Sequence, residues 1–394
     1  MRGARGHEAS GTPTTVAVLG GGQLGRMLGL AGVALGLGMR FLDPSPGAGA
    51  GAAGTLLTGA FDDPDALARL ATGAAVATYE WEGVPAEAAR AVAAAGVPVR
   101  PGSRALEVAQ DRLTEKELLR TLGIPTAPFA AVEEDDAEPG AALRRALEAV
   151  GIPAVVKTRR GGYDGKGQAV VRSPADVDGA WAALKGAGSL IAEGLVAFRR
   201  ELSIVAVRGL DGEVRAWPVV ENLHQGGILR VSRAPAPGVD PATEAAARAY
   251  ADAVLTELDY VGVVALELFD DPAALRVNEM APRVHNSGHW TIEGATTSQF
   301  ENHLRAILGW PLGDTAPRGV AAMVNCIGAL PDPAAVLAVP GAHLHRYGKE
   351  PRAGRKVGHV TVVAADEAAL EGRLSRVEEL VGGAEGAAPG PPGP

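Results

Sequence analysis

The sequence predicts an α/β protein built from more than one domain. Short apolar segments such as residues 16–20 and 38–43 alternate with Ala- and Leu-rich stretches, a pattern typical of a parallel sheet covered by helices. With 394 residues, 47% of them hydrophobic, the chain can bury two or three cores. A glycine-rich turn directly after the first apolar segment favours the same class, because such turns join strand to helix in nucleotide-binding folds.

Composition and charge argue against several classes of protein. The net charge is -9 and the chain has no basic block, which argues against a nucleic-acid partner. Cys326 is the single cysteine, so an internal disulfide and a thiolate zinc cluster are excluded, and a cytoplasmic location is expected. The apolar residues 16–39 are interrupted by Gln23 and Arg26 and follow no signal-peptide core, so we expect no membrane partner.

Residues 14–110 are expected to form the first domain, a Rossmann-like parallel sheet with covering helices. Gly20, Gly22 and Gly25 have the spacing of a dinucleotide-binding turn, and Asp43 follows about twenty residues later. The spacing leaves open whether the loop holds a nicotinamide or flavin dinucleotide or the phosphate of another ligand. The expected strands of this domain are residues 16–20, 38–43, 74–80 and 96–101.

Two further domains are expected, at residues 111–312 and 313–381. The second begins with a helix that ends at Gly123 and continues as strands that alternate with helices. The third contains two apolar strands and a final helix. The polar segment 1–13 and the Pro/Gly-rich segment 382–394 are expected to be disordered tails.

A glycine-rich segment between two expected strands has the features of a nucleotide lid. Lys157 lies on the first strand, and the loop that follows carries glycines at positions 161, 162, 165 and 167. Backbone N–H groups of such a loop approach phosphate oxygens closely, and a lysine adds a point charge. The alternative interpretation is an ordinary hairpin with a mobile turn.

The next apolar strand ends in Glu193, beside Leu195 and Val196. A carboxylate at this place can accept hydrogen bonds from an adenine amino group or from ribose hydroxyls. Many strands end in a glutamate that faces water, and without other evidence this pattern favours that simpler interpretation.

Two acids in neighbouring apolar strands carry the strongest signal. Glu267 and Glu279 are separated by a turn-like segment, so we expect them to face each other across adjacent antiparallel strands, with Asn278 alongside. Buried carboxylates need partners, and Mg²⁺ that bridges phosphate oxygens is a suitable one. The alternative is a pair of salt-bridged acids, which does not explain the asparagine.

Polar donors are dense directly after this hairpin. The run contains Arg283, His285, Asn286 and His289, a set that suits a pocket for an anion. Two histidines four residues apart raise the alternative of zinc. Pro282 disfavours a helix there, and no third ligand is evident.

A basic segment near the C-terminus holds Lys349, Arg352, Arg355 and Lys356. In a chain of net charge -9, a local positive cluster favours binding of a phosphate or a carboxylate. A solvated basic turn is the alternative.

These segments occur together in a known family. The chain closely resembles the N5-carboxyaminoimidazole ribonucleotide synthetases, which are ATP-grasp enzymes of purine biosynthesis, in the strings GGGQLGRM, DRLTEK, GGYDGKGQ, NLHQGGILR, NEMAPRVHNSGHW and GRKVGH. The resemblance covers residues 16–363. It implies an N-terminal Rossmann-like domain, a central ATP-grasp domain with a glycine-rich lid, and a small C-terminal α/β domain.

The resemblance implies an ATP-dependent carbon–nitrogen ligase. In this family ATP phosphorylates bicarbonate to carboxyphosphate, and the amino group of aminoimidazole ribonucleotide is then carboxylated with release of ADP and phosphate. Mg²⁺ or Mn²⁺ is the implied metal cofactor, and a cytoplasmic homodimer is the implied state. The N-terminal glycine loop would then hold the ribonucleotide and not NAD.

The resemblance also implies roles for individual residues. The implied metal ligands are Glu267 and Glu279. The residues of the bicarbonate and carboxyphosphate pocket are Arg283, His285, Asn286 and Lys356. Positions that contact the ribonucleotide are Gly22, Gln23, Leu24, Glu80, Tyr163, Lys166, Lys349 and Arg355. Positions that contact ATP are Arg112, Lys157, Gly162, Tyr163, Asp164, Gly165, Lys166, Gly167, Gln168, Glu193, Gly194, Leu195, Val196, Glu201, His224, Asn278 and Glu279.

Three alternatives remain at this point. Another ATP-grasp ligase, such as a formate-dependent glycinamide ribonucleotide transformylase or a biotin carboxylase, shares the lysine and the acid pair, although the strings RVHNSGHW and GRKVGH favour the first interpretation. A nicotinamide-binding dehydrogenase would use the first domain but leave the central region unexplained. A non-catalytic regulatory homologue is disfavoured because the charged positions needed for ATP and metal are present.

Overall fold

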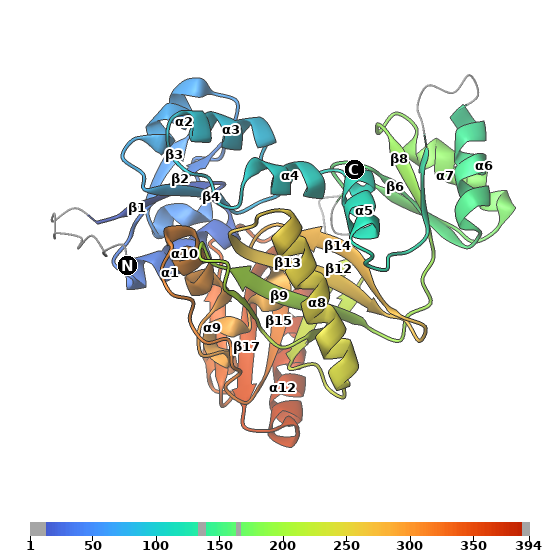
Figure 1. Ribbon diagram of the computed structural model, residues 1–394. Coiled ribbons are helices and arrows are strands. Elements are labelled where there is room, and N and C mark those ends of the chain that lie inside the picture. The colour runs from blue at the N-terminus through green and yellow to red at the C-terminus, as the bar shows by residue number, and fades with distance from the viewer. Residues whose placement is uncertain (1–12, 133–138, 163–166, 388–394) are drawn as a thin grey trace. The chain divides into compact units, whose positions relative to one another are not determined.

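The protein is described by a computed structural model that covers residues 13–132, 139–162 and 167–387. The chain divides into two compact units, residues 1–100 and 101–394 (Figure 1). Both units combine helices with sheets, so the expected α/β class is confirmed. No helix in the described ranges is long and apolar enough to cross a membrane.

The first unit contains a four-stranded parallel sheet in the order β3-β2-β1-β4. Its strands are β1 (Thr15–Leu19), β2 (Gly38–Asp43), β3 (Thr55–Thr58) and β4 (Val76–Tyr79), and its helices are α1 (Gln23–Ala34), α2 (Pro64–Ala71) and α3 (Ala86–Ala94). The expected strand at residues 96–101 forms only a single bridge between Ala77 and Val99; Pro98, on the side that faces β4, has no N–H to extend the ladder. The edge strand β3 was not expected from the sequence.

The second unit begins with two helices and a small antiparallel sheet in the order β5-β8-β6-β7. The elements are α4 (Ser103–Ala109), α5 (Arg112–Thr121), β5 (Phe129–Val132), α6 (Pro139–Val150), β6 (Ala154–Thr158), β7 (Gln168–Val171), α7 (Val177–Leu184) and β8 (Leu190–Gly194). Ala154 and Val156 of β6 and Ala192 of β8 pack in one core with α6 and α7. Because strand side chains alternate between faces, Lys157 and Glu193 lie on the opposite face.

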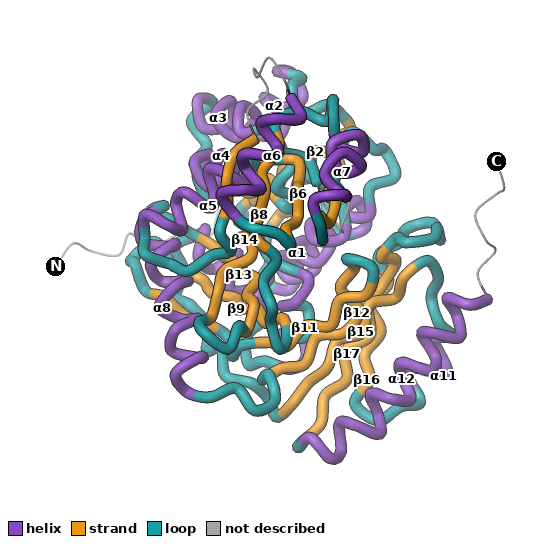
Figure 2. Tube along the Cα trace, turned by 90° about the vertical axis from the view of Figure 1, so that its right-hand side faces the viewer, coloured by secondary structure: helices purple, strands orange, loops and turns teal. Residues whose placement is uncertain are grey.

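A nine-stranded sheet forms the rest of the second unit, in the order β14-β13-β9-β11-β12-β15-β17-β16, with β10 paired to β9. Its strands are β9 (Glu201–Arg208), β10 (Val214–Ala216), β11 (Val220–Gln225), β12 (Ile228–Ala234), β13 (Gly262–Asp270), β14 (Leu275–Ala281), β15 (Val320–Ile327), β16 (Ala342–Arg346) and β17 (Lys356–Ala364). The strands of the last hundred residues therefore continue the sheet that begins in the central region (Figure 2).

Helices cover this large sheet. Residues of α8 share a core with β9, β13 and β14, and residues of α12 share a second core with β15 and β17 (Figure 2). The helices of this part are α8 (Pro241–Glu257), α9 (Thr291–Gly294), α10 (Gln299–Leu308), α11 (Pro333–Leu337) and α12 (Glu367–Ala387).

The C-terminal helix extends beyond Gly382, where the sequence predicts that the disordered tail begins. It continues to Ala387 because Glu385 is held by an ion pair with Arg230 and accepts a hydrogen bond of 3.2 Å from the backbone N–H of Ile327. Of the expected tails, 1–13 and 382–394, residues 1–12 and 388–394 lie outside the described residues.

Candidate active site

The two acids expected to face each other do so on the β13–β14 hairpin. Glu267 is directly opposite Glu279, and the register then shifts so that Leu268 is opposite Val277. Asn278 is therefore the extra residue of a β-bulge. The prediction of facing carboxylates is confirmed, whereas the bulge had no signal in the sequence.

Glu279 forms an ion pair with a cation from helix α5. Arg112 Nη1 lies 2.9 Å from Glu279 Oε2, and Arg112 Nη2 donates a hydrogen bond of 3.2 Å to the carbonyl of Gly162. The backbone N–H of Arg112 donates to Arg159 O at 3.0 Å. Arg112 therefore joins the start of the glycine-rich segment to the predicted metal ligand.

Glu267 has a histidine partner. Its Oε1 lies 3.2 Å from His285 Nε2. Burial acts to raise the pKa of Glu267, but the hydrogen bond and charge of His285 outweigh it, and the pKa falls to about 2. The charges of His224 and Lys356 act in the same direction, so both side chains lie near this carboxylate. Glu267 is therefore ionised at neutral pH.

The turn after the hairpin is fixed by an amide pair. Asn286 Nδ2 donates to Asn325 Oδ1 at 3.2 Å, and Asn325 Nδ2 donates to Asn286 Oδ1 at 2.8 Å. Arg283 is half-buried, and its Nη1 donates to Val284 O at 3.1 Å. Asn325 lies on β15, next to the strand that Lys356 begins. Asn286 is therefore tied to β15, while the neighbouring His285 lies against Glu267 of β13.

Glu193 is buried and paired with two lysines. Its Oε2 lies 3.1 Å from Lys157 Nζ and 3.3 Å from Lys116 Nζ, and the residue is 3% exposed. Burial acts to raise the pKa of Glu193, but the charges of the two lysines outweigh it and lower the pKa. The interpretation of Glu193 as a glutamate that faces water is therefore wrong. Sequence reasoning missed Lys116, whose only signal was its place in the DRLTEK string.

Glu201 and His224 form a second pair. His224 Nδ1 lies 2.7 Å from Glu201 Oε2. Burial acts to lower the pKa of His224, but the Glu201 carboxylate outweighs it and the pKa is raised. The connection from β8 to β9, which contains Leu195 and Val196, also carries Phe198, whose ring stacks on that of Phe269 at 4.7 Å.

The glycine-rich segment is described at both of its ends. Gly167 has φ of +69°, and a Cβ there would lie 2.8 Å from Thr158 Oγ1, so only glycine fits. Gln168 pairs with Lys157 across β6 and β7. Tyr163, Asp164, Gly165 and Lys166, to which the resemblance assigns ligand contacts, lie outside the described residues.

The glycine loop of the first unit already holds a carboxylate. Glu80, at the end of β4, accepts hydrogen bonds from the N–H groups of Gly22 and Gly25 at 2.6 and 2.7 Å. Asp43 accepts from the N–H of Gly21 at 2.8 Å. Acidic side chains thus occupy the backbone donors that bind pyrophosphate in a dinucleotide fold. The structure brings Glu80 to the expected substrate loop of Gly22, Gln23 and Leu24.

The other expected ribonucleotide contacts belong to the second unit. Lys349 and Arg355 lie between β16 and β17, where Arg355 Nη1 donates to Glu350 O at 3.4 Å. His289, half of the zinc alternative, has its Nδ1 3.2 Å from Gln299 Nε2, and its ring lies 5.0 Å from that of His359. The two rings therefore have different partners, Glu267 for His285 and Gln299 for His289, although Gln299 also hydrogen-bonds the backbone of His285.

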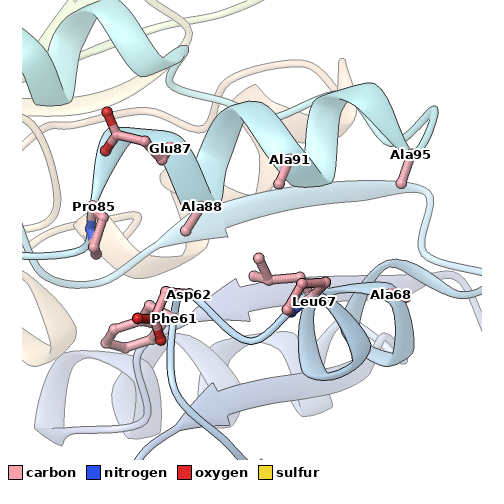
Figure 3. A pocket seen from close by; sticks show the side chains of 10 residues that line it. Phe61, Asp62, Leu67, Ala68, Pro85, Glu87, Ala88, Ala91 and Ala95 are labelled. Carbon is pink, nitrogen blue, oxygen red and sulfur yellow. The ribbon is translucent and has the colours of Figure 1, made fainter.

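Two surface hollows differ in their relation to these residues. One lies between α2 and α3, is lined mostly by apolar groups such as Leu67 and Ala88, and contains no predicted site residue (Figure 3). The other lies beside β11, β12, β15 and α12 and includes His224 and Asn325. The second hollow is thus adjacent to the expected anion pocket.

Comparison with known proteins gives close relatives over nearly the whole chain. The chain is 51% identical to the N5-carboxyaminoimidazole ribonucleotide synthase of Pseudomonas aeruginosa, over 93% of this chain and 99% of the relative. It is 44% identical to the corresponding protein of Brucella melitensis, over 88% and 96%. The crystal structure of the synthetase from Thermus thermophilus superposes with a TM-score of 0.88 at 56% identity and covers 93% of this chain and 98% of that one.

A structure from Aspergillus clavatus is described as a complex with ADP and 5-aminoimidazole ribonucleotide. It matches with a TM-score of 0.86 at 34% identity and covers 94% of this chain and 99% of that one.

Family models match three parts of the chain. They are the ribonucleotide synthetase preATP-grasp domain at residues 13–110, the ATP-grasp domain at 117–300, and the phosphoribosylaminoimidazole carboxylase C-terminal domain at 321–373. Together with the paired acids and lysines, these matches define an ATP-grasp enzyme that uses ATP. The chain belongs to the family of N5-carboxyaminoimidazole ribonucleotide synthases, and the resemblance inferred from its sequence is confirmed.

Proposed function

We propose that this chain carboxylates 5-aminoimidazole ribonucleotide with bicarbonate, at the cost of one ATP, to give N5-carboxyaminoimidazole ribonucleotide, ADP and phosphate. The observation that carries the proposal is the β13–β14 hairpin, where Glu267 and Glu279 face each other beside Arg112 and the lysine-paired Glu193. Carboxylates and cationic side chains that lie side by side suit a metal–nucleotide complex, because its metal needs carboxylates and its phosphates need cations.

The residues present fit Mg²⁺, or Mn²⁺ in its place. Mg²⁺ is usually held by one or two carboxylates, while substrate phosphates and water complete its coordination. Glu267 and Glu279 supply two carboxylates from adjacent strands. Within the described parts of the chain, no group of three or more His, Cys, Asp or Glu side chains could hold a metal without other ligands. When bound, the metal neutralises charge on the transferring phosphoryl group.

The nucleotide contacts proposed for this chain rest on the resemblance, and the ion pairs of two of them support it. Arg112 and Lys157, now paired with Glu279 and Glu193, would exchange these partners for phosphate oxygens. Glu193, on the same sheet face as Lys157, is placed to accept hydrogen bonds from the nucleoside. The other proposed ATP contacts are Gly162, Gly167, Gln168, Gly194, Leu195, Val196, Glu201, His224 and Asn278.

The chemistry divides into two displacements. A bicarbonate oxygen attacks the γ-phosphorus of ATP, the bond to the β-phosphate oxygen breaks, and ADP leaves carboxyphosphate behind. The amine nitrogen then attacks the carboxyl carbon, loses a proton, and displaces inorganic phosphate. We assign to Arg283, His285, Asn286 and Lys356 the stabilisation of the developing negative charges, since fixed donors and cations near reacting oxygens lower such barriers.

The remaining assignments rest on the resemblance and on composition. The ribonucleotide is assigned to Gly22, Gln23, Leu24, Glu80, Lys349 and Arg355, together with Tyr163 and Lys166. The domain boundaries at residues 110 and 312 stay predictions. A homodimer is proposed from the family, and a cytoplasmic location from the single cysteine.

The test is release of phosphate from Mg-ATP by the purified protein, with bicarbonate, in the presence and absence of aminoimidazole ribonucleotide. We expect release that rises only with the ribonucleotide and that is matched by labelled bicarbonate in an acid-labile product. Glycinamide ribonucleotide with formate is the control substrate pair. A response to the control pair, or none to aminoimidazole ribonucleotide, would contradict the proposed acceptor.

A further inference from the structure

The bulge that carries Glu279 lies on an edge of the nine-stranded sheet. Strand β14 is the last in the sheet order, so its outer N–H and C=O groups have no full strand partner. Buried backbone groups without partners are costly. At Val277 the partner is the segment after α5, since Val277 N donates to Pro125 O at 2.8 Å. The backbone groups of the bulge need side chains as partners.

Two consecutive side chains of helix α5 supply them. The carboxylate of Glu115 accepts a hydrogen bond from the backbone N–H of Met280, and Lys116 Nζ donates to the backbone carbonyl of Asn278 at 3.0 Å. These two backbone groups flank Glu279 on either side. Glu115 is 3% exposed and Lys116 is 2% exposed, so neither charge is placed there for contact with water.

The same helix reaches Glu279 and Glu193 as well. Arg112, one turn before Glu115 and Lys116, pairs with the Glu279 side chain, and Lys116 also pairs with Glu193 of β8. One face of α5 thus contacts three successive residues of the bulge and a residue of the smaller sheet. A β-bulge redirects side chains, and here both of its ends are tied to one rigid helix.

We propose that Glu115 and Lys116 are positioning residues that hold the bulged segment 278–280 and thereby direct the Glu279 carboxylate at the metal. The proposal rests on the metal role proposed above for Glu279. Both side chains act through the backbone on either side of this ligand. Partners that orient metal ligands typically change metal affinity by about 10–100-fold when they are removed.

The chemistry of Glu115 suggests a conservative replacement. The contact with Met280 needs only an oxygen acceptor, which glutamine also provides. Methionine has a similar length but no comparable acceptor, so Glu115→Met removes the contact with Met280. Lys116→Met likewise removes the donor to the Asn278 carbonyl.

The experiment measures Mn²⁺ binding by electron paramagnetic resonance in the presence of a non-hydrolysable ATP analogue, and the Mg²⁺ dependence of kcat at saturating ATP. The variants are Glu115→Gln, Glu115→Met and Lys116→Met in the full chain. Glu117→Ala is the matched control, because Glu117 is exposed on the same helix. A melting curve for each variant shows whether it is folded.

We expect Glu115→Met and Lys116→Met to weaken metal binding and to raise the half-saturating Mg²⁺ concentration by about tenfold or more. Glu115→Gln should stay within about threefold of the parent, and Glu117→Ala should match it. Should Glu115→Met fail to fold, Lys116→Met and Glu115→Gln decide the matter. Metal affinity in Lys116→Met equal to that of Glu117→Ala, or Glu115→Gln impaired as strongly as Lys116→Met, would overturn the proposal.

Glu279→Gln in the same assay separates this inference from the proposed function. If Glu279→Gln binds metal as the parent does, Glu279 is no ligand, and the positioning role is overturned whatever the carboxylation assay shows. If Glu279→Gln loses metal while the α5 variants retain it, only the positioning role is overturned and the proposed function stands.

Discussion

The glycine loop of the first unit and the bulged hairpin of the second use opposite arrangements of charge. In the loop, the N–H groups of Gly22 and Gly25 already hold the carboxylate of Glu80. In the hairpin Glu279 is held by Arg112, and on strand β8 Glu193 is held by two lysines; in the proposed function these cations pass to the nucleotide phosphates. A glycine motif thus specifies a backbone shape, whereas the residue that fills it decides whether a pyrophosphate can enter.

The largest effect is expected at Glu279, whose ion pair with Arg112 would be exchanged for contacts with the metal and the nucleotide. Glu279→Gln removes a charged ligand from the proposed metal, and metal stabilisation of a transferring phosphoryl group is worth several kcal/mol. ATP turnover with bicarbonate and aminoimidazole ribonucleotide should therefore fall by about a hundredfold or more, with an unchanged melting temperature. Coupled measurement of ADP release gives the rate.

The exposed acid Glu213 is a suitable control, because it lies in the same unit and pairs only at the surface with Arg215. Glu213→Gln should retain parental turnover. Turnover near the parental rate in Glu279→Gln, with Mg²⁺ supplied, would contradict the role of Glu279 as a metal ligand.

The hairpin was the part of the site most accessible to sequence reasoning. Two apolar strands joined by a short turn bring Glu267 and Glu279 close to each other, but counting back from the turn, where Asp270 is opposite Leu275, would put Asn278 opposite Glu267. The bulge at Asn278 adds one residue and has no compositional signal of its own. The contacts of Arg112 and Lys116 with this hairpin join residues more than 160 positions apart, and no local pattern reports such contacts.

The second prediction tests whether Glu80 is structurally required in the glycine loop. Glu80→Ala would leave two N–H groups without their acceptor. Loss of a hydrogen bond to a charged group costs about 1.5–3 kcal/mol, so the local free energy of opening should fall by roughly 2–4 kcal/mol once water has partly replaced the carboxylate. Hydrogen exchange of peptides from residues 15–43 in the full chain measures this locally.

Glu87→Ala is the matched control for Glu80→Ala. Glu87 is an exposed acid of the same unit, paired with Arg90 at the surface, and its removal should change the local stability by less than about 0.5 kcal/mol. Equal protection of the loop in the two variants would mean that the loop does not depend on its internal carboxylate.

Sequence reasoning found the loop but not its occupant, for a physical reason. Gly20, Gly22 and Gly25 are spaced for a strand-to-helix turn, and this requirement is local. Glu80 reaches the loop from β4, more than fifty residues later, because β4 pairs in parallel with β1. Only the strand order makes the two ends meet. The resemblance implied that Glu80 and this loop share a ligand, but not that Glu80 binds the loop.

A smaller effect is expected from alanine at Gly20, with Gly36 as its comparison. Both glycines have positive φ, +100° and +72°, where a side chain costs about 1–2 kcal/mol. A Cβ at Gly36 meets no heavy atom within 4 Å, whereas a Cβ at Gly20 would lie 2.6 Å from Glu80 Cγ. Gly20→Ala should therefore destabilise the chain by about 1–3 kcal/mol more than Gly36→Ala.

Urea unfolding of both variants gives the difference between their free energies of unfolding. The double variant with Glu80→Ala sharpens the result, because removal of the glutamate side chain removes the clash and should erase most of the excess cost. An equal cost of the two alanines in the parent background would show that the carboxylate moves aside easily.

The effect that is smallest at neutral pH, and that grows only in acid, separates the two units. Residues 13–100 contain no histidine, whereas the second unit contains seven, among them the buried His303, whose Nδ1 accepts a hydrogen bond of 3.1 Å from the N–H of Val263. Burial lowers the pKa of His303 to about 3. The folded chain therefore keeps His303 neutral below pH 6.5, where the unfolded chain binds a proton.

The free energy of unfolding should consequently fall as the pH drops from about 6.5 to about 3, by at most about 1.4 kcal/mol per pH unit from this one group. The contribution is fully present above pH 6.5. His303→Asn keeps an acceptor for Val263 and removes the proton, so its stability should depend less steeply on pH in this window. His343→Asn, at an exposed position, should leave the slope unchanged. Parallel slopes for the parent and His303→Asn would show that this histidine takes up a proton without unfolding, and the difference in acid response between the units would then have to come from other groups.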